Sequence, residues 1–225
     1  MNIEKHLINY NYSRNNNIKY IVIHDTGNTD KGANAMCHYR YFNGGNRNAS
    51  AHYFVDDTRI VQTVEDFNAS WHCGDGHNRY GINNHNSIGV EICINSDGNY
   101  NEAVRKTIEL VKYLMQKYNI SINRVVRHYD ASKKCCPASM SSNNWAKWNW
   151  FKSQLGHVVN VGVKSEYGTV TATVLNVRSQ ATTNSNVLGQ LKNGQQVHIF
   201  KDCGNGWYEI YYGQHGGYVS KQYIR

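Results

Sequence analysis

The sequence lacks several features that mark other classes of protein. It has no apolar run of the roughly 18 residues that a membrane-spanning helix needs, which argues against an integral membrane protein. No apolar core follows the first residues, Met1 to His6, so we expect synthesis in the cytoplasm without a signal peptide. The six cysteines form no C-x-x-C pair, and we therefore expect no disulfide framework and mostly buried thiols.

A dense block of lysine and arginine is also missing, although the net charge is +8. The first 157 residues carry 18 basic and 13 acidic side chains, and the remaining residues carry 6 and 3. Both parts are mildly basic, which suits a nucleic acid, an anionic polymer such as a bacterial cell wall, or ordinary solubility. No motif supports nucleic-acid binding, and we expect neither nucleic acid nor membrane as a partner.

The chemistry of the chain concentrates in front of its single proline, Pro137. Two apolar, β-branched runs each end in a histidine, His24 after the first and His128 after the second. Cys136 follows His128 by eight positions and precedes the proline. Imidazole and thiolate are good zinc ligands, so we hypothesise that these three residues bind one Zn²⁺ and leave its fourth position to water. Without His128 and Cys136, we would interpret His24 as a hydrogen-bonded core residue.

Two charged residues are candidates for catalytic roles beside this metal. Glu91 lies in the predicted strand 87–94 among apolar neighbours, where a carboxylate is costly unless it is paired. It is either a structural ion-pair partner or a base that takes a proton from metal-bound water. Such a water would explain why a carboxylate lies among apolar neighbours. Lys134 precedes Cys136 by two positions and is placed to face a substrate oxygen. Zinc lowers the pKa of its water to about 7 and polarises a carbonyl, which suits amide hydrolysis.

Three further side chains are candidates for contact with a substrate. Trp71 and His72 come before a loop rich in Gly, Asn and His, and such loops often line sites. They either contact a sugar or peptide, or they are a buried tryptophan and a surface histidine. His52, in the predicted strand 50–55, is a fourth metal-site candidate, although a packing or substrate role is simpler.

Hydrophobic periodicity predicts two domains: 1–155, and 168–225 after a linker at 156–167. The first domain alternates strands with helices, and its residues 1–17 are read as a surface lead-in. In the helix 143–155 the aromatic residues either pack or, less simply, stack on sugars. From residue 168 short β runs and turns indicate a small barrel, whose exposed aromatic residues suit binding. The expected strands are 19–23, 50–55, 59–64, 87–94, 125–126, 170–173, 175–179, 187–189, 196–200, 207–211 and 217–219, and the other expected helices are 32–42 and 102–118.

Several motifs in a fixed order carry a resemblance to a known family. The motifs are Ile-Val-Ile-His24-Asp-Thr, Ser-Ala-His52-Tyr, Ala-Ser-Trp71-His72, Asn86-Ser87-Ile88-Gly-Val-Glu91, Val-Arg-His128-Tyr-Asp and Lys134-Cys-Cys136-Pro137. By these motifs, residues 18 to 155 resemble the type 2 N-acetylmuramoyl-L-alanine amidases, which include phage endolysins, bacterial autolysins and animal peptidoglycan recognition proteins.

This resemblance implies an α/β domain with a central mixed sheet flanked by helices. It implies a zinc site of His24, His128 and Cys136, with Glu91 and Lys134 as catalytic groups. It also implies cleavage of the bond between N-acetylmuramic acid and L-alanine in bacterial peptidoglycan. The alternative is a non-catalytic peptidoglycan-binding protein on the same fold, but proteins of that kind typically lack the cysteine ligand.

The chain departs from the family pattern at two places. Some members have an assisting tyrosine just before the histidine of the second strand, and here that residue is Ala51, so no tyrosine role is carried over. Many relatives have Asp at the position of Cys136, whose thiolate makes the metal site more sensitive to oxidation. Cys135 adjoins the ligand, but the family's cysteine precedes proline and follows lysine by two, which selects Cys136.

The C-terminal part contains a second set of motifs, Leu175-Asn-Val-Arg178-Ser, Val187-Leu-Gly-Gln-Leu, Gly206-Trp207-Tyr208 and Gly217-Tyr218-Val219-Ser. By these motifs, residues 168 to 225 resemble the bacterial SH3-like cell-wall-binding domain. An amidase joined to a wall-binding module is the arrangement of a Gram-positive phage endolysin or autolysin, and tethering suits an insoluble substrate. The expected absence of a signal peptide favours an endolysin that reaches the wall through the host membrane.

Overall fold

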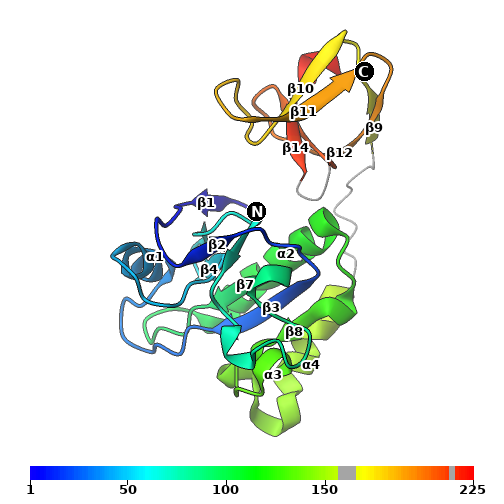
Figure 1. Cartoon of the computed structure of the whole chain (residues 1–225). Helices are drawn as coiled ribbons and strands as arrows, with labels where there is room; N and C mark the ends of the chain where they lie inside the picture. The colour runs from blue at the N-terminus through cyan, green and yellow to red at the C-terminus, as the bar shows by residue number, and fades with distance from the viewer. Residues whose placement is uncertain (157–165, 213–215) are drawn as a thin grey trace. The chain divides into compact units, whose positions relative to one another are not determined.

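The computed structural model describes residues 1–156, 166–212 and 216–225 (Figure 1). The chain divides into two compact units, Met1–His157 and Val158–Arg225. Most of the predicted linker at 156–167 lies outside the described residues, so the predicted domain limits stay predictions. Within the described part of the chain, no helix combines the length and apolar character needed to cross a membrane.

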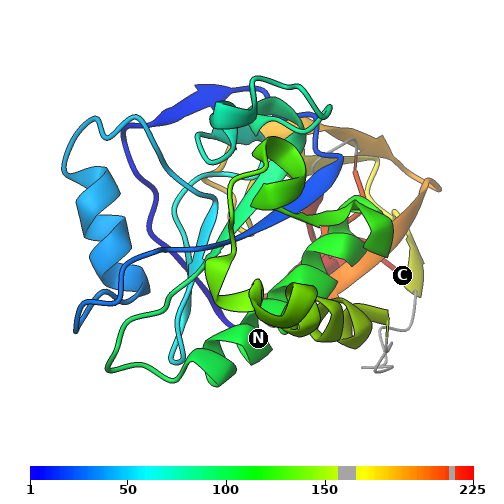
Figure 2. The same ribbon diagram turned by 90° about the horizontal axis from the view of Figure 1, so that it is seen from below.

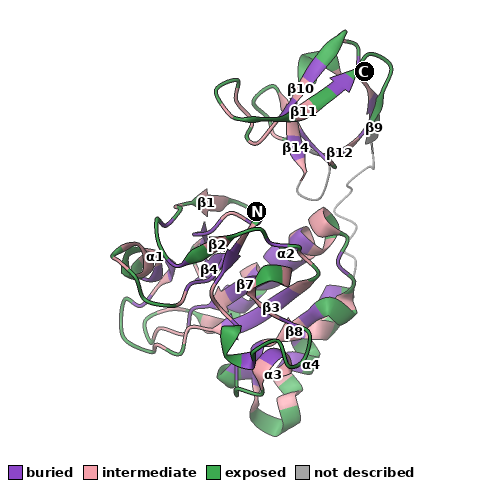
Figure 3. Cartoon of the chain, in the orientation of Figure 1, coloured by how far each residue is buried: buried purple, intermediate pink, exposed green. Residues whose placement is uncertain are grey.

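A six-stranded mixed sheet forms the centre of the first unit. Its strand order is β1-β5-β4-β7-β3-β8, with β4 antiparallel to β5 and every other neighbouring pair parallel. The central strands are continuous apolar runs because both faces of the sheet are covered, as the burial colours of Figure 3 show. The strands are β1 (Ile3–Lys5), β3 (Tyr20–Asp25), β4 (Tyr53–Val55), β5 (Ile60–Gln62), β7 (Ser87–Ile92) and β8 (Val125–Arg127).

The prediction that residues 1–17 are a surface lead-in is wrong. β1 joins the edge of the main sheet by pairing with β5, and β2 (Tyr12–Arg14) pairs with β6 (Asn68–Ser70) in a separate two-stranded sheet. Their side chains are exposed or only partly buried, and neither strand shows an apolar alternation. Main-chain pairing places them, with side-chain contacts such as the Lys5–Glu65 ion pair and the packing of Ile3 on the core, and a hydrophobic pattern does not reveal that kind of pairing.

The two faces of the main sheet have different covers. Ile21 and Ile23 belong to the larger core, which packs against α2 (Tyr100–Tyr118) and α4 (Ser142–Gly156). These two helices lie side by side, and α1 (Ala35–Asn43) lies apart from them (Figure 2). The opposite face carries Val22, Phe54 and His24, and it is covered by α1, by α3 (His128–Ser132) and by the loop after β6. The predicted site residues lie on this second face.

The helices follow from their capping residues and apolar faces. The Asn99 side chain accepts the N–H of Glu102 at the start of α2, and Asn119 ends the helix in the left-handed conformation, as predicted. In α4, Trp148 and Phe151 are buried, which confirms the packing role, whereas Trp150 is exposed.

The second unit is a curled six-stranded antiparallel sheet around its own core, which confirms the predicted small all-β domain. Its strand order is β11-β10-β14-β13-β12-β9. The predicted strand 170–173 is wrong, because β9 ends at Thr169 and Val170 makes only an isolated bridge to Ile224. Gly168 fits there because a Cβ would lie 2.1 Å from Ile224. The strands are β9 (Glu166–Thr169), β10 (Val174–Arg178), β11 (Val187–Lys192), β12 (Gln196–Asp202), β13 (Trp207–Ile210) and β14 (Gly217–Ser220).

Candidate metal centre

Three neighbouring strands bring the first site residues together at their carboxyl ends. His24 pairs with Glu91 in the parallel register of β3 and β7. On the other side of β3, Ile23 pairs with Arg127, so the next residue, His128, begins α3 beside His24. The ring centroids of the two histidines are 4.6 Å apart. Residues from three distant parts of the sequence therefore meet because the strands that carry them are neighbours.

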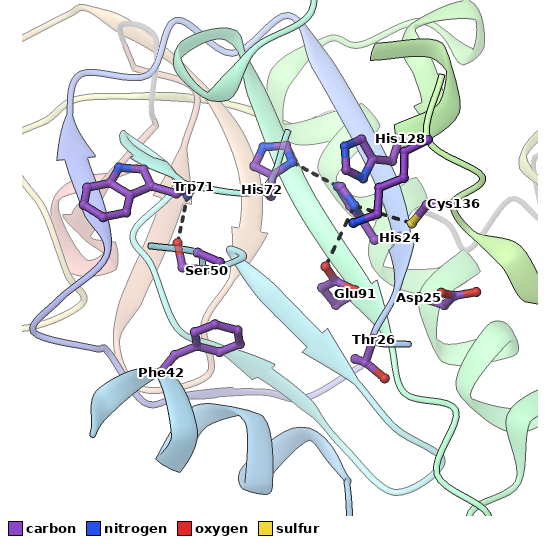
Figure 4. Close-up of a pocket in the computed structure, with 12 residues that line it drawn as sticks. His24, Asp25, Thr26, Phe42, Ser50, Trp71, His72, Glu91, His128 and Cys136 are labelled. Carbon is purple, nitrogen blue, oxygen red and sulfur yellow. Dashed lines mark hydrogen bonds and ion pairs between the residues drawn. The ribbon is translucent and has the colours of Figure 1, made fainter. Parts of the chain in front are cut away.

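Cys136 completes the group after the chain has passed through α3. The Tyr129 N–H donates to the Cys136 carbonyl oxygen over 3.0 Å, which brings the cysteine back to the start of the helix. Its Sγ lies 3.8 Å from His24 Nδ1 (Figure 4). One donor atom from each of His24, His128 and Cys136 lies within 4.8 Å of the others, and all three residues are buried. Tetrahedral zinc requires an N to S separation of about 3.6 Å, so this donor set fits the ion.

The protonation states of these residues suit metal binding. Burial, followed by the nearby His72, His128 and Lys134, lowers the pKa of His24 well below its usual value. Burial also lowers the pKa of His128, although Asp75 opposes this effect. Both rings are therefore neutral near pH 7 and each has a lone pair to offer. Burial, and then Glu91, raises the pKa of the Cys136 thiol to about 12, so a bound metal must displace its proton.

Glu91 lies next to the donors without joining them. Its Oε1 is 3.8 Å from His24 Nδ1, and its Oε2 is buried with no hydrogen-bond partner among the described residues. Burial, and then Asp25, raises the pKa of Glu91 well above its usual value, while Lys134 opposes the shift. A carboxyl group with a raised pKa beside an open pocket is suited to proton transfer.

One pocket collects every residue that the sequence nominated for the site except His52. Lys134 is exposed at its rim, and Trp71 and His72 also line it. The Trp71 indole Nε1–H donates to Ser13 Oγ over 2.9 Å, and its main-chain N–H donates to Ser50 Oγ over 2.8 Å. The assigned roles of these residues in catalysis and substrate binding stay predictions. The full lining is His24, Asp25, Thr26, Phe42, Ala49, Ser50, Trp71, His72, Glu91, His128, Lys134 and Cys136.

His52 has the packing role that was the simpler alternative. Its side chain is fully buried, and its Nδ1 accepts hydrogen bonds from the Gly89 N–H over 3.0 Å and the Ser70 hydroxyl over 2.7 Å. Its Nε2–H donates to the Asn68 carbonyl oxygen over 2.9 Å. Both ring nitrogens are occupied, and the ring joins β6 to β7.

Asp75 is a site neighbour that sequence reasoning missed. Its Oδ1 accepts a hydrogen bond from His128 Nε2–H over 2.7 Å. A carboxylate between two glycines, Gly74 and Gly76, is the only local signal for it, and this signal does not name a partner.

The cysteines are all free thiols, which agrees with the expected lack of disulfides. Cys73, Cys93 and Cys136 are buried, but Cys37 and Cys135 are exposed. Cys203 is half-buried, so the expectation that most of the thiols are buried is wrong. The exposed Cys135 is not part of the three-residue donor group.

Comparison with known families divides the chain in the same order. The family profile described as N-acetylmuramoyl-L-alanine amidase matches residues 14–139, and the profile described as bacterial SH3 domain matches residues 173–225. Two Bacillus subtilis (strain 168) relatives are both named N-acetylmuramoyl-L-alanine amidase. CwlH is 41% identical over 132 residues, covering 59% of this chain and 50% of CwlH. XlyA is 40% identical over 137 residues, covering 61% of this chain and 44% of XlyA. The chain thus spans about half the length of these curated relatives.

Solved structures show the same fold. The catalytic domain of XlyA superimposes with a TM-score of 0.63 at 38% identity, covering 69% of this chain and 100% of that domain. PlyL superimposes with a TM-score of 0.60 at 32% identity, covering 69% of this chain and 97% of PlyL.

Proposed function

The chain belongs to the N-acetylmuramoyl-L-alanine amidase family, and from this premise we propose that it cleaves bacterial peptidoglycan with the help of one zinc ion. The bond to be cut joins the lactyl group of N-acetylmuramic acid to L-alanine. One observation carries the proposal: the donor atoms of His24, His128 and Cys136 converge in a pocket that also holds Glu91 and Lys134.

The residues around the pocket divide the work of amide hydrolysis. When bound, zinc polarises a carbonyl and lowers the pKa of water. Glu91 takes a proton from the attacking water, and its raised pKa suits it to hold that proton. The water oxygen adds to the lactyl carbonyl carbon, and the Lys134 ammonium stabilises the oxyanion. The C–N bond then breaks, and the proton passes from Glu91 to the leaving nitrogen of L-alanine.

In this proposal, the second unit holds the enzyme on peptidoglycan. Its match to the bacterial SH3 domain supports a role in binding the cell wall. Joining a binding module to a catalytic unit raises the local substrate concentration, which matters most when the substrate is insoluble. We therefore place the site of action at the cell wall, where the protein serves as an endolysin or an autolysin.

Mass analysis of the fragments released from purified cell walls tests the proposed reaction. We expect peptides with a free N-terminal L-alanine and glycan strands with free lactyl carboxyl groups. Treatment with a chelator should stop their release, and added Zn²⁺ should restore it. Cleavage of a glycosidic or peptide bond would contradict the proposal, and wall binding without any release would support the non-catalytic alternative.

A further inference from the structure

We propose that one short loop, residues 71–76, determines which ring nitrogen each of the two candidate zinc-binding histidines offers to the metal. The loop follows β6 and supplies His72 to His24 and Asp75 to His128. This inference deepens the proposed function, and it rests on that function because it takes His24 and His128 as zinc ligands. It assigns His72 and Asp75 as positioning residues that act through the ligands.

A directed chain of hydrogen bonds sets the tautomer of His24. The Ser87 hydroxyl donates its only proton to the Asn83 carbonyl oxygen over 2.5 Å. Ser87 Oγ must therefore accept from His72 Nε2, which lies 3.1 Å away. With its proton on Nε2, the neutral His72 ring accepts at Nδ1 from His24 Nε2–H over 3.0 Å. The Nδ1 of His24 is then left with its lone pair, and this atom faces Cys136 and Glu91. Figure 4 shows His72 and Cys136 on opposite sides of the His24 ring.

The second histidine is held in the same way by a carboxylate. A carboxylate only accepts, so the 2.7 Å contact with Asp75 Oδ1 requires the proton of His128 to lie on Nε2. The Nδ1 of His128 is left for the metal. Burial acts to raise the pKa of Asp75, but His128 and the Ser132 side chain, on α3, act to lower it, and the net lowering favours the carboxylate form that accepts from His128.

The loop fits against its neighbours because two glycines allow close contact. A Cβ on Gly89 would lie 2.5 Å from His72 Cγ, so only glycine lets the imidazole pack on β7. A Cβ on Gly76 would lie 2.2 Å from the Ala131 carbonyl oxygen, so only glycine lets the loop rest against α3. The Asn84 Oδ1 accepts from the N–H groups of His72 and Cys73 over 3.0 and 2.9 Å and anchors the start of the loop.

This arrangement has a measurable consequence for metal affinity. A free neutral imidazole interconverts between two tautomers, and a fixed partner at Nε2 removes that freedom before the metal arrives. Loss of such an outer partner typically costs about 10–100-fold in metal affinity. One loop therefore contributes to both histidine ligands, although none of its residues belongs to the three-residue donor group.

The tautomers of the metal-free full-length protein provide the first test, since they do not depend on zinc or on activity. Long-range ¹H–¹⁵N correlation spectra should show both His24 and His128 with the proton on Nε2. His72→Phe keeps a ring of similar size but cannot accept, so it should convert His24 to a mixture of tautomers and leave His128 unchanged. Asp75→Ala should do the reverse. Unaltered tautomers in these variants would overturn the inference.

Zinc affinity, measured by competition with a chromophoric chelator, provides the second test. We expect His72→Phe and Asp75→Ala to bind Zn²⁺ about 10–100-fold more weakly. His72→Gln and Asp75→Asn keep an oxygen that can accept from the histidine, and they should recover most of the loss. His77→Phe changes an exposed histidine just beyond the loop and is the matched control, expected to bind as the wild type does.

The outcomes separate this inference from the proposed function. If the wild type binds zinc tightly and the folded Phe and Ala variants bind it equally well, the loop does not position the ligands, and the proposed function stands. If Gln and Asn fail to rescue binding although they fold, the role is merely structural and the inference falls. If the wild type binds no zinc, the metal part of the proposed function falls, and the inference falls with it.

Discussion

The two units of the chain treat polar side chains in opposite ways. The first unit buries polar and charged residues on the site face of its sheet and around Asp66, among them His24, His52 and His128. In the described part of the second unit, Glu209 is the only buried residue that is charged or polar. The core there is otherwise apolar, and Tyr167 and Tyr211 lie at the surface in a stack on either side of His198.

This difference has consequences for the chemistry that each unit can support. A buried polar group costs free energy unless it is hydrogen-bonded, and burial shifts its pKa away from the ordinary value. The first unit accepts that cost and gains residues with altered proton affinity in a pocket. Among its described residues the second unit buries a polar group only at Glu209, while Tyr167 and Tyr211 lie at the surface.

The largest expected effect comes from removing a ligand in the first unit. Cys136→Ala should lose tight zinc binding and lower the rate of wall hydrolysis by about 10³–10⁵-fold, since a catalytic metal supplies several kcal/mol. Cys135→Ala, at the exposed neighbouring thiol, is the matched control and should behave as the wild type. Zinc content and the release of wall fragments measure both variants. Full activity in Cys136→Ala would remove this cysteine from the metal site.

Glu91→Gln should separate proton transfer from metal binding in the same unit. The amide keeps the shape of the carboxyl group but cannot carry the proton, so turnover should fall by about 10²–10⁴-fold while zinc content stays at the wild-type level. Glu109→Gln changes a glutamate on the surface of α2 and serves as the control. A Glu91→Gln enzyme with normal turnover would show that another group moves the proton.

Deletion of residues 168–225 tests the division of labour between the units. Affinity for purified walls should fall by about 100-fold, because the tether is lost. Hydrolysis of a soluble muramoyl-peptide should continue at the rate of the full chain, since every residue of the pocket belongs to the first unit. Equal wall affinity in the two proteins would show that the second unit is not the binding module.

Two aspartates, Asp66 and Asp202, allow the contribution of a carboxylate to stability to be compared between the two units. Asp66 is buried in the first unit, where the hydroxyls of Tyr53 and Tyr118 donate to it over 2.6 and 2.5 Å and Lys117 Nζ lies 3.4 Å away. Burial on its own would raise the pKa of Asp66, but Lys117 and the two hydroxyls outweigh it and lower the pKa. Asp202 in the second unit forms a surface ion pair with Lys221.

The smallest effects are expected from converting these aspartates to asparagine. Asp66→Asn should lower the free energy of unfolding of the first unit by about 2 kcal/mol at pH 7, and its melting temperature by about 5 °C. Because the folded pKa lies below the unfolded one, this contribution is present above about pH 4 and is lost as the pH falls through the folded pKa. Calorimetry at pH 7 and pH 3 measures it. Asp202→Asn should leave the second unit's melting temperature nearly unchanged, and an equal loss in both units would contradict the contrast drawn between them.

Much of the fold was predictable because its signals are local. The apolar runs before His24 and Glu91 predicted buried strands, and the amphipathic stripe ending at Asn119 predicted α2. The strands β1 and β2 were not predictable, because neither shows an apolar alternation and their pairing uses main-chain groups that every sequence has. The same reason explains the misplaced β9, whose position depends on its pairing with β12.

The sequence by itself determined which residue types were available for chemistry: two histidines at strand ends, and a cysteine before the single proline. The tertiary structure alone decided that their donor atoms lie within 4.8 Å of one another, through the parallel register of β7, β3 and β8. It alone decided that His72 and Asp75 reach the far nitrogens of the two rings. The physical reason is that side-chain identity is a local property, whereas the direction of a hydrogen bond depends on where distant segments pack.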